Sequence, residues 1–185
     1  MELQNFDKIL ERVPKMSRPM RVILAGSDGE NMLKGIFAAQ EKGLVQPVLV
    51  GDRARTITVL EQFGLEREPY TMVDTPPGHN ITQEAIDIIN AGDGDVLMRG
   101  NIATRDFLMP VLDKANKLRT ERLMSHVSLA SLPEYPKLIA LSDMTVVIKP
   151  NMTQKKAIIK NTADALKAFG YENPKLALLS LVEKV

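Results

Sequence analysis

The sequence has 185 residues, of which 44% are hydrophobic, so the chain is long enough and apolar enough to bury a substantial core. It has 24 Lys and Arg against 23 Asp and Glu, which leaves no excess positive charge to hold a nucleic acid or an anionic membrane surface. It has no Cys, which excludes disulfides, thiolate metal ligands and a Cys nucleophile. The N-terminal segment is charged throughout, unlike a signal peptide, and no apolar run is long enough to cross a bilayer as a helix. We therefore expect a globular cytoplasmic protein that has neither nucleic acid nor membrane as a partner.

Apolar runs that end at Gly or Asp alternate with amphipathic stretches through the first two thirds of the chain. The apolar runs predict buried strands at 21–26, 47–52, 70–74 and 96–100. The amphipathic stretches predict helices at 6–13, 30–43, 56–63, 81–90 and from Thr104 onward. This alternation is typical of parallel βαβ units whose helices cover both faces of the sheet, and ligands bind such sheets at the carboxyl ends of the strands.

The pattern changes at Leu123, because three strand-like segments follow with only short connections between them. These segments are 124–132, 137–143 and 144–150. No helix fits between them, so we expect an antiparallel hairpin or meander. Residues 153–169 then form an amphipathic helical pattern closed by Gly170, and residues 175–185 read as a last strand.

This change predicts a domain boundary near residues 119–125. We expect an N-terminal α/β domain with a parallel sheet at 1–122 and the beginning of a second α/β domain at 123–185. A buried strand at the end of the chain would leave apolar surface and backbone groups unpaired. We therefore expect the second domain to be incomplete, the chain to be truncated, and the exposed edges to support self-association.

The turn after the first predicted strand is a candidate anion site. It contains Ser27 and Asp28 before a predicted helix whose free amide groups could receive a phosphate or carboxylate, so we take both residues as candidates for binding a cofactor. Gly26 and Gly29 do not complete a dinucleotide-binding fingerprint, and no phosphate-binding P-loop motif occurs anywhere. The alternative is an ordinary turn in which Ser27 or Asp28 caps the helix.

The segment after the fourth predicted strand is a stronger candidate. Arg99 ends the strand, Gly100 permits close approach to the backbone, and Thr104 opens the next helix. Helix-terminal amides, the Thr104 hydroxyl and the guanidinium groups of Arg99 and Arg105 could together neutralise a phosphoryl group. The alternative is that Thr104 is a helix cap and that both arginines are solvated.

A third candidate segment lies at the expected domain junction, where Arg119 and Arg122 precede Ser125 and His126. His126 could act as a base, although a lone His beside an apolar strand is more often structural. Neighbouring residues of a strand point to opposite faces, so Ser125 and His126 cannot pair as nucleophile and base. The sequence has only two His, far apart, and no dense carboxylate motif, so we expect no metal site and place His79 at the surface.

Residues 25–52, 97–129 and 148–185 resemble consecutive stretches of the phosphate acetyl/butyryltransferase family, most closely its phosphotransbutyrylase branch. The resemblance covers nearly the whole chain and rests on the order of the segments. It implies an isocitrate/isopropylmalate-dehydrogenase-like fold of two α/β domains with a cleft between them, and a homodimer.

The same resemblance implies an acyltransferase that converts acyl-CoA and phosphate to acyl phosphate and CoA, with coenzyme A as a substrate and no cofactor required. It implies catalytic roles for Arg119, Ser125 and His126. It implies substrate binding by Arg99, Gly100 and Thr104. Glu121 departs from the small residue usual at its position in the family.

Family members are longer, and their later segment, with a Ser and an Asp that handle the CoA thiol, has no counterpart here. An impaired or inactive enzyme is therefore expected if the sequence is entire. This leaves open a second hypothesis, a non-catalytic module that binds CoA or phosphate. A third, a nucleotide-binding oxidoreductase domain, rests only on the alternation of strands and helices and lacks the glycine fingerprint.

Overall fold

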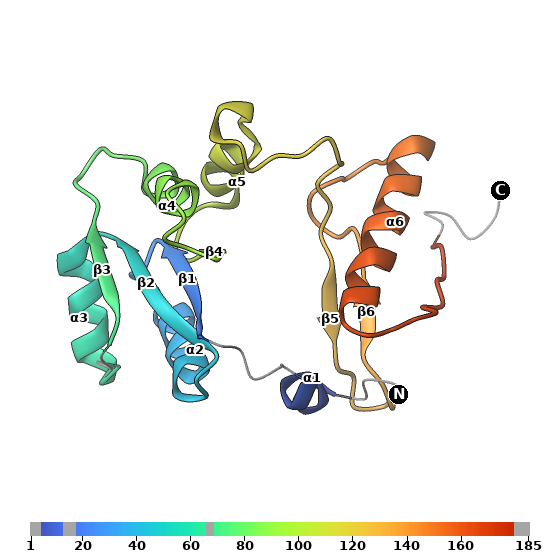
Figure 1. Ribbon diagram of the computed structural model, residues 1–185, viewed down its shortest axis with the longest axis horizontal. Helices are drawn as coiled ribbons and strands as arrows, with labels where there is room; N and C mark the ends of the chain where they lie inside the picture. The colour runs from blue at the N-terminus through green and yellow to red at the C-terminus, as the bar shows by residue number, and fades with distance from the viewer. Residues whose placement is uncertain (1–4, 13–17, 66–68, 180–185) are drawn as a thin grey trace. The chain divides into compact units, whose positions relative to one another are not determined.

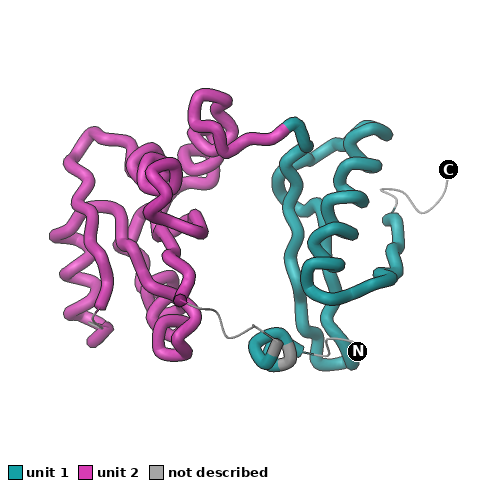
Figure 2. The backbone as a smooth tube through the Cα atoms, in the orientation of Figure 1, with its two compact units in different colours: residues 1–15, 121–185 teal, residues 16–120 magenta. Residues whose placement is uncertain are grey.

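The computed structural model (Figure 1) describes residues 5–12, 18–65 and 69–179, and the chain divides into two compact units (Figure 2). We call residues 16–120 the sheet unit, drawn in magenta, and residues 1–15 with 121–185 the hairpin unit, drawn in teal. None of the described helices is both long and apolar enough to span a membrane.

The sheet unit is built on a four-stranded parallel sheet with the strand order β3-β2-β1-β4. Its strands are β1 (Met20–Ala25), β2 (Val45–Gly51), β3 (Thr71–Asp74) and β4 (Val96–Arg99). Its helices are α2 (Glu30–Glu41), α3 (Arg53–Phe63), α4 (Ile81–Asn90) and α5 (Thr104–Leu112), followed by the short 3-10 helix η1 (Lys114–Asn116). The predicted parallel α/β architecture is confirmed.

Alternate residues of the central strands face opposite layers of helices, as expected for a sheet that is buried on both sides. Leu24 and Leu49 belong to a core cluster with Phe37 of α2 and other residues of α2 and α3. Ile23 belongs to the other cluster, with Ala85 of α4. Helices α2 and α3 therefore cover one face of the sheet, and α4 and α5 cover the other (Figure 1).

Side-chain caps determine where two of these helices begin. The Asn80 side chain accepts hydrogen bonds from the amides of Thr82 and Gln83, and α4 has the bounds predicted from the sequence. Helix α3 begins at Arg53, earlier than the predicted residue 56, because the Asp52 side chain accepts from the amide of Arg55. The polar cap therefore extends this helix beyond its apolar pattern.

Asp95 joins the beginnings of β1 and β4. Its carboxylate accepts hydrogen bonds from Arg18 Nη1 at 2.6 Å and Nη2 at 2.9 Å, and from the backbone amide of Arg21 at 2.8 Å. The hydrogen bonds from the Arg18 guanidinium, and then those from Arg21, hold the pKa of Asp95 well below its usual range. These contacts lie at the amino ends of the two strands, opposite the ends at which ligands bind.

The hairpin unit contains α1 (Phe6–Arg12), an antiparallel pair of β5 (Ser128–Ala130) and β6 (Ile139–Leu141), and α6 (Met152–Ala168). The predicted antiparallel pairing is confirmed for these two strands. Helix α6 begins with a capping box, in which Asn151 and Gln154 exchange side-chain to backbone hydrogen bonds. Gly170, at φ +91°, follows its end, as the sequence indicated.

Two predicted strands of the hairpin unit are wrong as far as they are described. Residues 144–150 form bends, because Asp143 Oδ1 accepts hydrogen bonds from the amides of Thr145 and Val146 and so draws the backbone into a turn. Residues 175–179 form no strand, and Leu179 is 90% exposed. The rest of that prediction, residues 180–185, lies outside the described part of the chain, as does Val13 of the first predicted helix.

Candidate functional site

The loops that follow β1 and β4 meet at the carboxyl edge of the sheet. Strand β1 lies between β2 and β4, and its last residue, Ala25, pairs with Val50 on one side and Arg99 on the other. From this edge the chain passes into α2 on one face and α5 on the other. Such a switch point is where open parallel sheets bind ligands, so the first two candidate segments are brought together at a suitable place.

Two glycines allow these loops to cross at backbone contact. The amides of Gly100 and Asn101 donate to the carbonyls of Ala25 and Gly26, each at 2.8 Å. A Cβ at Gly100 would lie 2.1 Å from the Gly26 carbonyl oxygen, and a Cβ at Gly26, where φ is +81°, would lie 2.6 Å from Cγ1 of Ile102. Gly100 is therefore required for packing the two loops, while its predicted contact with substrate stays a prediction.

Ser27 and Asp28 are engaged within the protein. Ser27 is fully buried, and its Oγ lies 2.9 Å from Thr56 Oγ1, so direct contact between Ser27 and a cofactor does not fit this structure. Asp28 forms an ion pair with Arg55 at 3.6 Å. Neither residue caps α2, whose N-cap is Gly29 with no side-chain hydrogen bond, so the capping alternative is wrong.

Donors gather where β4 leads into α5. Arg99 is exposed, and its Nη1 donates to the carbonyl of Ile102 at 2.6 Å, which ties the guanidinium to its own loop. Thr104 is the first residue of α5, after the N-cap Ala103, so the alternative that Thr104 is the cap is wrong. The side chains of Thr104 and Arg105 are exposed and make no hydrogen bond or ion pair with another described residue.

The first turn of α5 has the polarity that an anion requires. The amide of Phe107 is the first to bond within the helix, to the carbonyl of Ala103, so the amides of residues 104–106 point outward from the helix end. Asp106 in this turn opposes an anion, whereas Arg99 and Arg105 favour one. The loop can therefore bind one phosphate-sized anion through amides, a hydroxyl and two guanidinium groups.

The remaining predicted residues fall in different units. Arg119 belongs to the sheet unit, is exposed, and makes no side-chain hydrogen bond or ion pair with another described residue. Ser125 and His126 belong to the hairpin unit and are both half-buried. The structure thus groups Arg119 with the loop after β4 within one unit, and Ser125 with His126 within the other.

Asn161 of α6 holds the segment that carries Ser125. Its Nδ2 donates to the Ser125 Oγ at 2.9 Å and to the carbonyl of Leu123 at 2.7 Å. Its Oδ1 accepts from Arg122 Nε at 3.1 Å and Nη2 at 2.7 Å, and the same Nη2 lies 2.7 Å from Asp164 Oδ2. Arg122 is therefore bound to α6, and Ser125 is fixed by an amide.

His126 is held through its backbone. Its amide donates to Asp143 Oδ2 at 3.0 Å, and its carbonyl accepts from Ser142 Oγ at 2.6 Å. Partial burial opposes ionisation of Asp143, but the amides of Val146, Thr145 and His126 outweigh it and lower the pKa of Asp143. Asp143 thus fixes the backbone rather than the imidazole, whose Nδ1 is buried and has no partner among the described residues.

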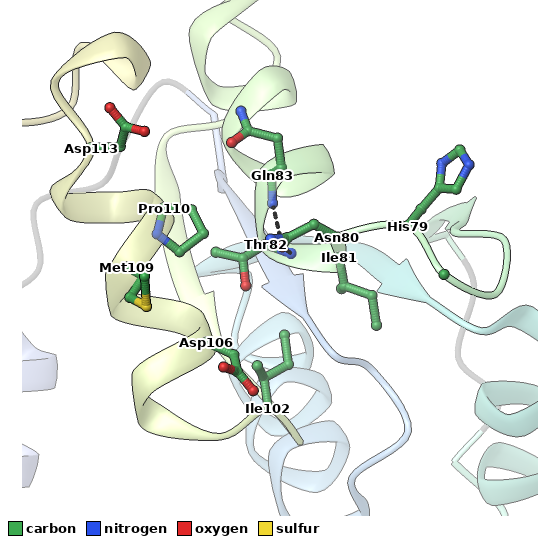
Figure 3. A pocket seen from close by; sticks show the side chains of 11 residues that line it. His79, Asn80, Ile81, Thr82, Gln83, Ile102, Asp106, Met109, Pro110 and Asp113 are labelled. Carbon is green, nitrogen blue, oxygen red and sulfur yellow. Dashed lines mark hydrogen bonds between the residues drawn. The ribbon is translucent and has the colours of Figure 1, made fainter.

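A pocket of about 630 Å³ lies between the start of α4 and one side of α5. Its lining residues are Gly78, His79, Asn80, Ile81, Thr82, Gln83, Ile102, Asp106, Met109, Pro110 and Asp113. Figure 3 shows Asp106, Met109 and Pro110 on α5 on one side, and His79 on the loop before α4 farther away. The lining carries two carboxylates and neither Lys nor Arg, so the pocket disfavours a phosphate. The described residues also contain no group of three or more His, Cys, Asp or Glu suited to a metal ion.

Comparison with known proteins assigns the chain to a family. Residues 75–185 match the family described as phosphate acetyl/butaryl transferase. The chain belongs to this family. The match covers the loop after β4, all of α5, and both Ser125 and His126, and the resemblance inferred from the sequence is confirmed.

Curated relatives of this phosphate acetyl/butaryl transferase family member are similar over nearly its whole length. It is 28% identical over 183 residues to a phosphate butyryltransferase of Clostridium acetobutylicum, with 99% of this chain and 60% of the relative covered. It is 31% identical over 180 residues to a phosphate acetyltransferase of Rhizobium meliloti, with 97% of this chain and 57% of the relative covered. The chain therefore spans less than two thirds of the length of these relatives.

Two solved structures share the fold. A branched-chain phosphotransacylase from Enterococcus faecalis V583 matches with a TM-score of 0.71 at 23% identity, covering 89% of this chain and 57% of that one. A phosphotransacetylase from Streptococcus pyogenes matches with a TM-score of 0.71 at 14% identity, covering 90% of this chain and 59% of that one. At these identities the likeness supports the fold alone.

Two features of this phosphate acetyl/butaryl transferase family member were not anticipated. The first is Asn161, one turn from the buried Ile158 on α6, and a polar residue beside the apolar face of a helix could have indicated it. The second is the pocket, which combines residues far apart in sequence. The apolar residues of α5 were the available signal in the sequence for this pocket. In the structure none of them is buried.

Proposed function

We propose that the chain is part of a phosphate acyltransferase that converts a short-chain acyl-CoA and phosphate to an acyl phosphate and CoA. A phosphate oxygen attacks the thioester carbonyl carbon, the carbon–sulfur bond breaks, and the phosphate proton ends on the CoA thiol. The match of residues 75–185 to the phosphate acetyl/butaryl transferase family carries this proposal. The names of the relatives, phosphate butyryltransferase and phosphate acetyltransferase, describe the same chemistry.

The phosphate is proposed to bind at the loop between β4 and α5. Outward amides, the free Thr104 hydroxyl and the guanidinium groups of Arg99 and Arg105 support this site. We assign Arg119 to the same anion, because its guanidinium is exposed and belongs to the same unit. Held there by several donors, the phosphate would be oriented for attack at little entropic cost in the reaction step.

Two roles are assigned in the hairpin unit. His126 is proposed to move the proton from phosphate to the thiol, since an imidazole can accept and release a proton near neutral pH. Its backbone is anchored at both the amide and the carbonyl, which supports a fixed position. Ser125 is proposed to bind the reacting groups through its hydroxyl.

The wider architecture is also a proposal. We infer two α/β domains, 1–122 and 123–185, of the isocitrate/isopropylmalate-dehydrogenase type. The parallel sheet and the division of the chain between residues 120 and 121 support this inference, whereas residues 1–15 belong to the hairpin unit and not to the sheet unit. We infer a homodimer, supported by the large exposed apolar side chains of the hairpin unit, among them Ile148 at 88% and Met152 at 68% exposed. We infer a cytoplasmic location, supported by the complete lack of Cys.

Release of free CoA thiol tests the proposal directly. The purified chain is mixed with acetyl-CoA or butyryl-CoA, with and without phosphate, and thiol is followed with a colorimetric reagent. The chain has no Cys, so the protein contributes no thiol of its own. We expect release that depends on phosphate and on the chain. Binding of phosphate or CoA by calorimetry without thiol release would instead support the non-catalytic binding module.

A further inference from the structure

We propose that Asn161 is a positioning residue that turns the Ser125 hydroxyl group into a hydrogen-bond donor for an anionic oxygen of the substrates. This inference rests on the proposed acyl transfer. It assigns a role to a residue of α6 that makes contact with Ser125 and not with the reacting groups. The oxygen belongs either to the phosphate or to the thioester carbonyl as negative charge develops on it.

The neighbours of Asn161 fix the orientation of its amide. The side chain of Arg122 can only donate, so the amide atom that faces it at 2.7 Å is the oxygen Oδ1. The carbonyl of Leu123 can only accept, so the atom that faces it at 2.7 Å is the nitrogen Nδ2. Both contacts thus require the same orientation of the amide. In this orientation Asn161 Nδ2 donates to Ser125 Oγ at 2.9 Å.

This direction determines what the Ser125 hydroxyl can do. The amide nitrogen has no lone pair to offer, so the hydroxyl hydrogen cannot point at Asn161 and is left for another acceptor. A hydroxyl that already accepts a hydrogen bond is polarised and becomes a better donor. Ser125 is therefore suited to donate to an oxyanion and is not prepared as a base.

Hydrogen bonds to Arg122 hold the Asn161 amide at the end that does not contact Ser125. Arg122 joins Asn161 and Asp164, which lie on adjacent turns of α6, and so prevents the amide from rotating. Asp164 reaches Arg122 but has no hydrogen bond to Ser125 among the described contacts. Asp164 thus offers a matched control, a polar residue of the same network outside the bond that the proposal requires.

Replacing Asn161 with Asp reverses the bond to Ser125. A carboxylate can only accept, so the Ser125 hydrogen turns toward it and is withdrawn from the substrate, while Arg122 keeps its partner. Losing one hydrogen bond to a charged group corresponds to about a ten- to hundredfold loss. We expect this loss in kcat/KM for phosphate-dependent thiol release from Asn161→Asp and from Ser125→Ala. We expect near wild-type values from Asp164→Asn, which keeps an oxygen that can accept from Arg122.

The split between kinetic constants identifies the oxygen. A rise in the KM for phosphate at unchanged kcat places the Ser125 hydrogen bond on the phosphate, and a fall in kcat at unchanged KM places it on the carbonyl oxygen. The double variant Asn161→Asp with Ser125→Ala tests whether Asn161 acts through Ser125. We expect it to lose no more than Ser125→Ala alone, because both changes remove the same donor.

Four results would overturn the inference. Asn161→Asp with wild-type kinetic constants would exclude the positioning role, and so would losses that multiply in the double variant. Ser125→Ala with wild-type constants would exclude the donor even if Asn161→Asp failed to fold, which circular dichroism would reveal. A wild-type chain that neither releases thiol nor binds phosphate would overturn the proposed function and this role with it, and is recognised before any variant is compared.

Discussion

Gly100 lies where the loop after β4 crosses the loop after β1. Because it has no side chain, the two backbones can approach each other closely. A Cβ there would meet the Gly26 carbonyl oxygen at 2.1 Å, and backbone atoms cannot move aside cheaply. We expect Gly100→Ala to lower the free energy of unfolding by about 3 kcal/mol or more, at the upper end for overpacked sites. Urea unfolding followed by circular dichroism measures this change.

Gly35 provides the matched control, since a Cβ at this position of α2 would meet nothing within 4 Å. Gly35→Ala should raise the free energy of unfolding by about 0.5–1 kcal/mol, because alanine loses less backbone entropy in a helix. Opposite signs for the two substitutions are expected. Equal effects would contradict the close crossing of the two loops.

Asp95 should make stability depend on pH. Its pKa is lowered in the folded state by hydrogen bonds from Arg18 and Arg21, so its contribution is fully present above the unfolded pKa of about 3.9 and is lost as the pH falls toward the folded value. We expect the free energy of unfolding to fall less steeply below pH 4 in Asp95→Asn than in the wild type. Thermal unfolding across this pH range measures the two slopes.

Asp93 is the control for this experiment, because it lies 3.5 Å from the same Arg21 but is 75% exposed. Exposed ion pairs contribute little, so Asp93→Asn should keep the wild-type slope. If Asp95→Asn keeps that slope as well, the hydrogen bonds of Asp95 do not link the ends of β1 and β4 energetically.

At the scale of elements, helices were predicted better than strands for a physical reason. Helix α4 was predicted with its observed bounds, because a helix closes its hydrogen bonds locally and Asn80 marks its start in the sequence. A strand forms its hydrogen bonds with another strand, and the local sequence does not show which strand that is. Residues 144–150 have the apolar composition of a strand, yet local hydrogen bonds to Asp143 fold them into bends.

The capping box of α6 gives a prediction at this scale. Asn151→Ala removes the side chain that accepts from the amide of Gln154, and it keeps the backbone amide of residue 151 that donates to Gln154 Oε1. We expect a loss of about 1 kcal/mol in the free energy of unfolding. Thr153→Ala, an exposed change in the same turn, should alter it by less than about 0.5 kcal/mol. Similar losses from both would contradict a role for the box.

At the scale of the whole molecule, the order of segments in the sequence predicted the family, and strand ends predicted where the loop after β4 would lie. The contacts of individual residues could not be predicted in the same way. Ser27 was expected to face a ligand but is buried against Thr56, a residue of the next helix. The link from Asn161 to Ser125 spans 36 positions, so the place of Asn161 beside the apolar face of α6 could indicate that residue but not its partner.

The phosphate dependence of thiol release in Arg119→Ala tests the central claim most directly. If the guanidinium groups that we assign to the anion site bind the phosphate that attacks acyl-CoA, this substitution should raise the KM for phosphate about ten- to hundredfold, the cost of one charge-assisted hydrogen bond. Lys42→Ala is the control, because this substitution also removes one positive charge. Lys42 follows the end of α2 and is exposed. It should leave the KM unchanged. Equal values of the KM in both variants, or thiol release that needs no phosphate, would contradict the account.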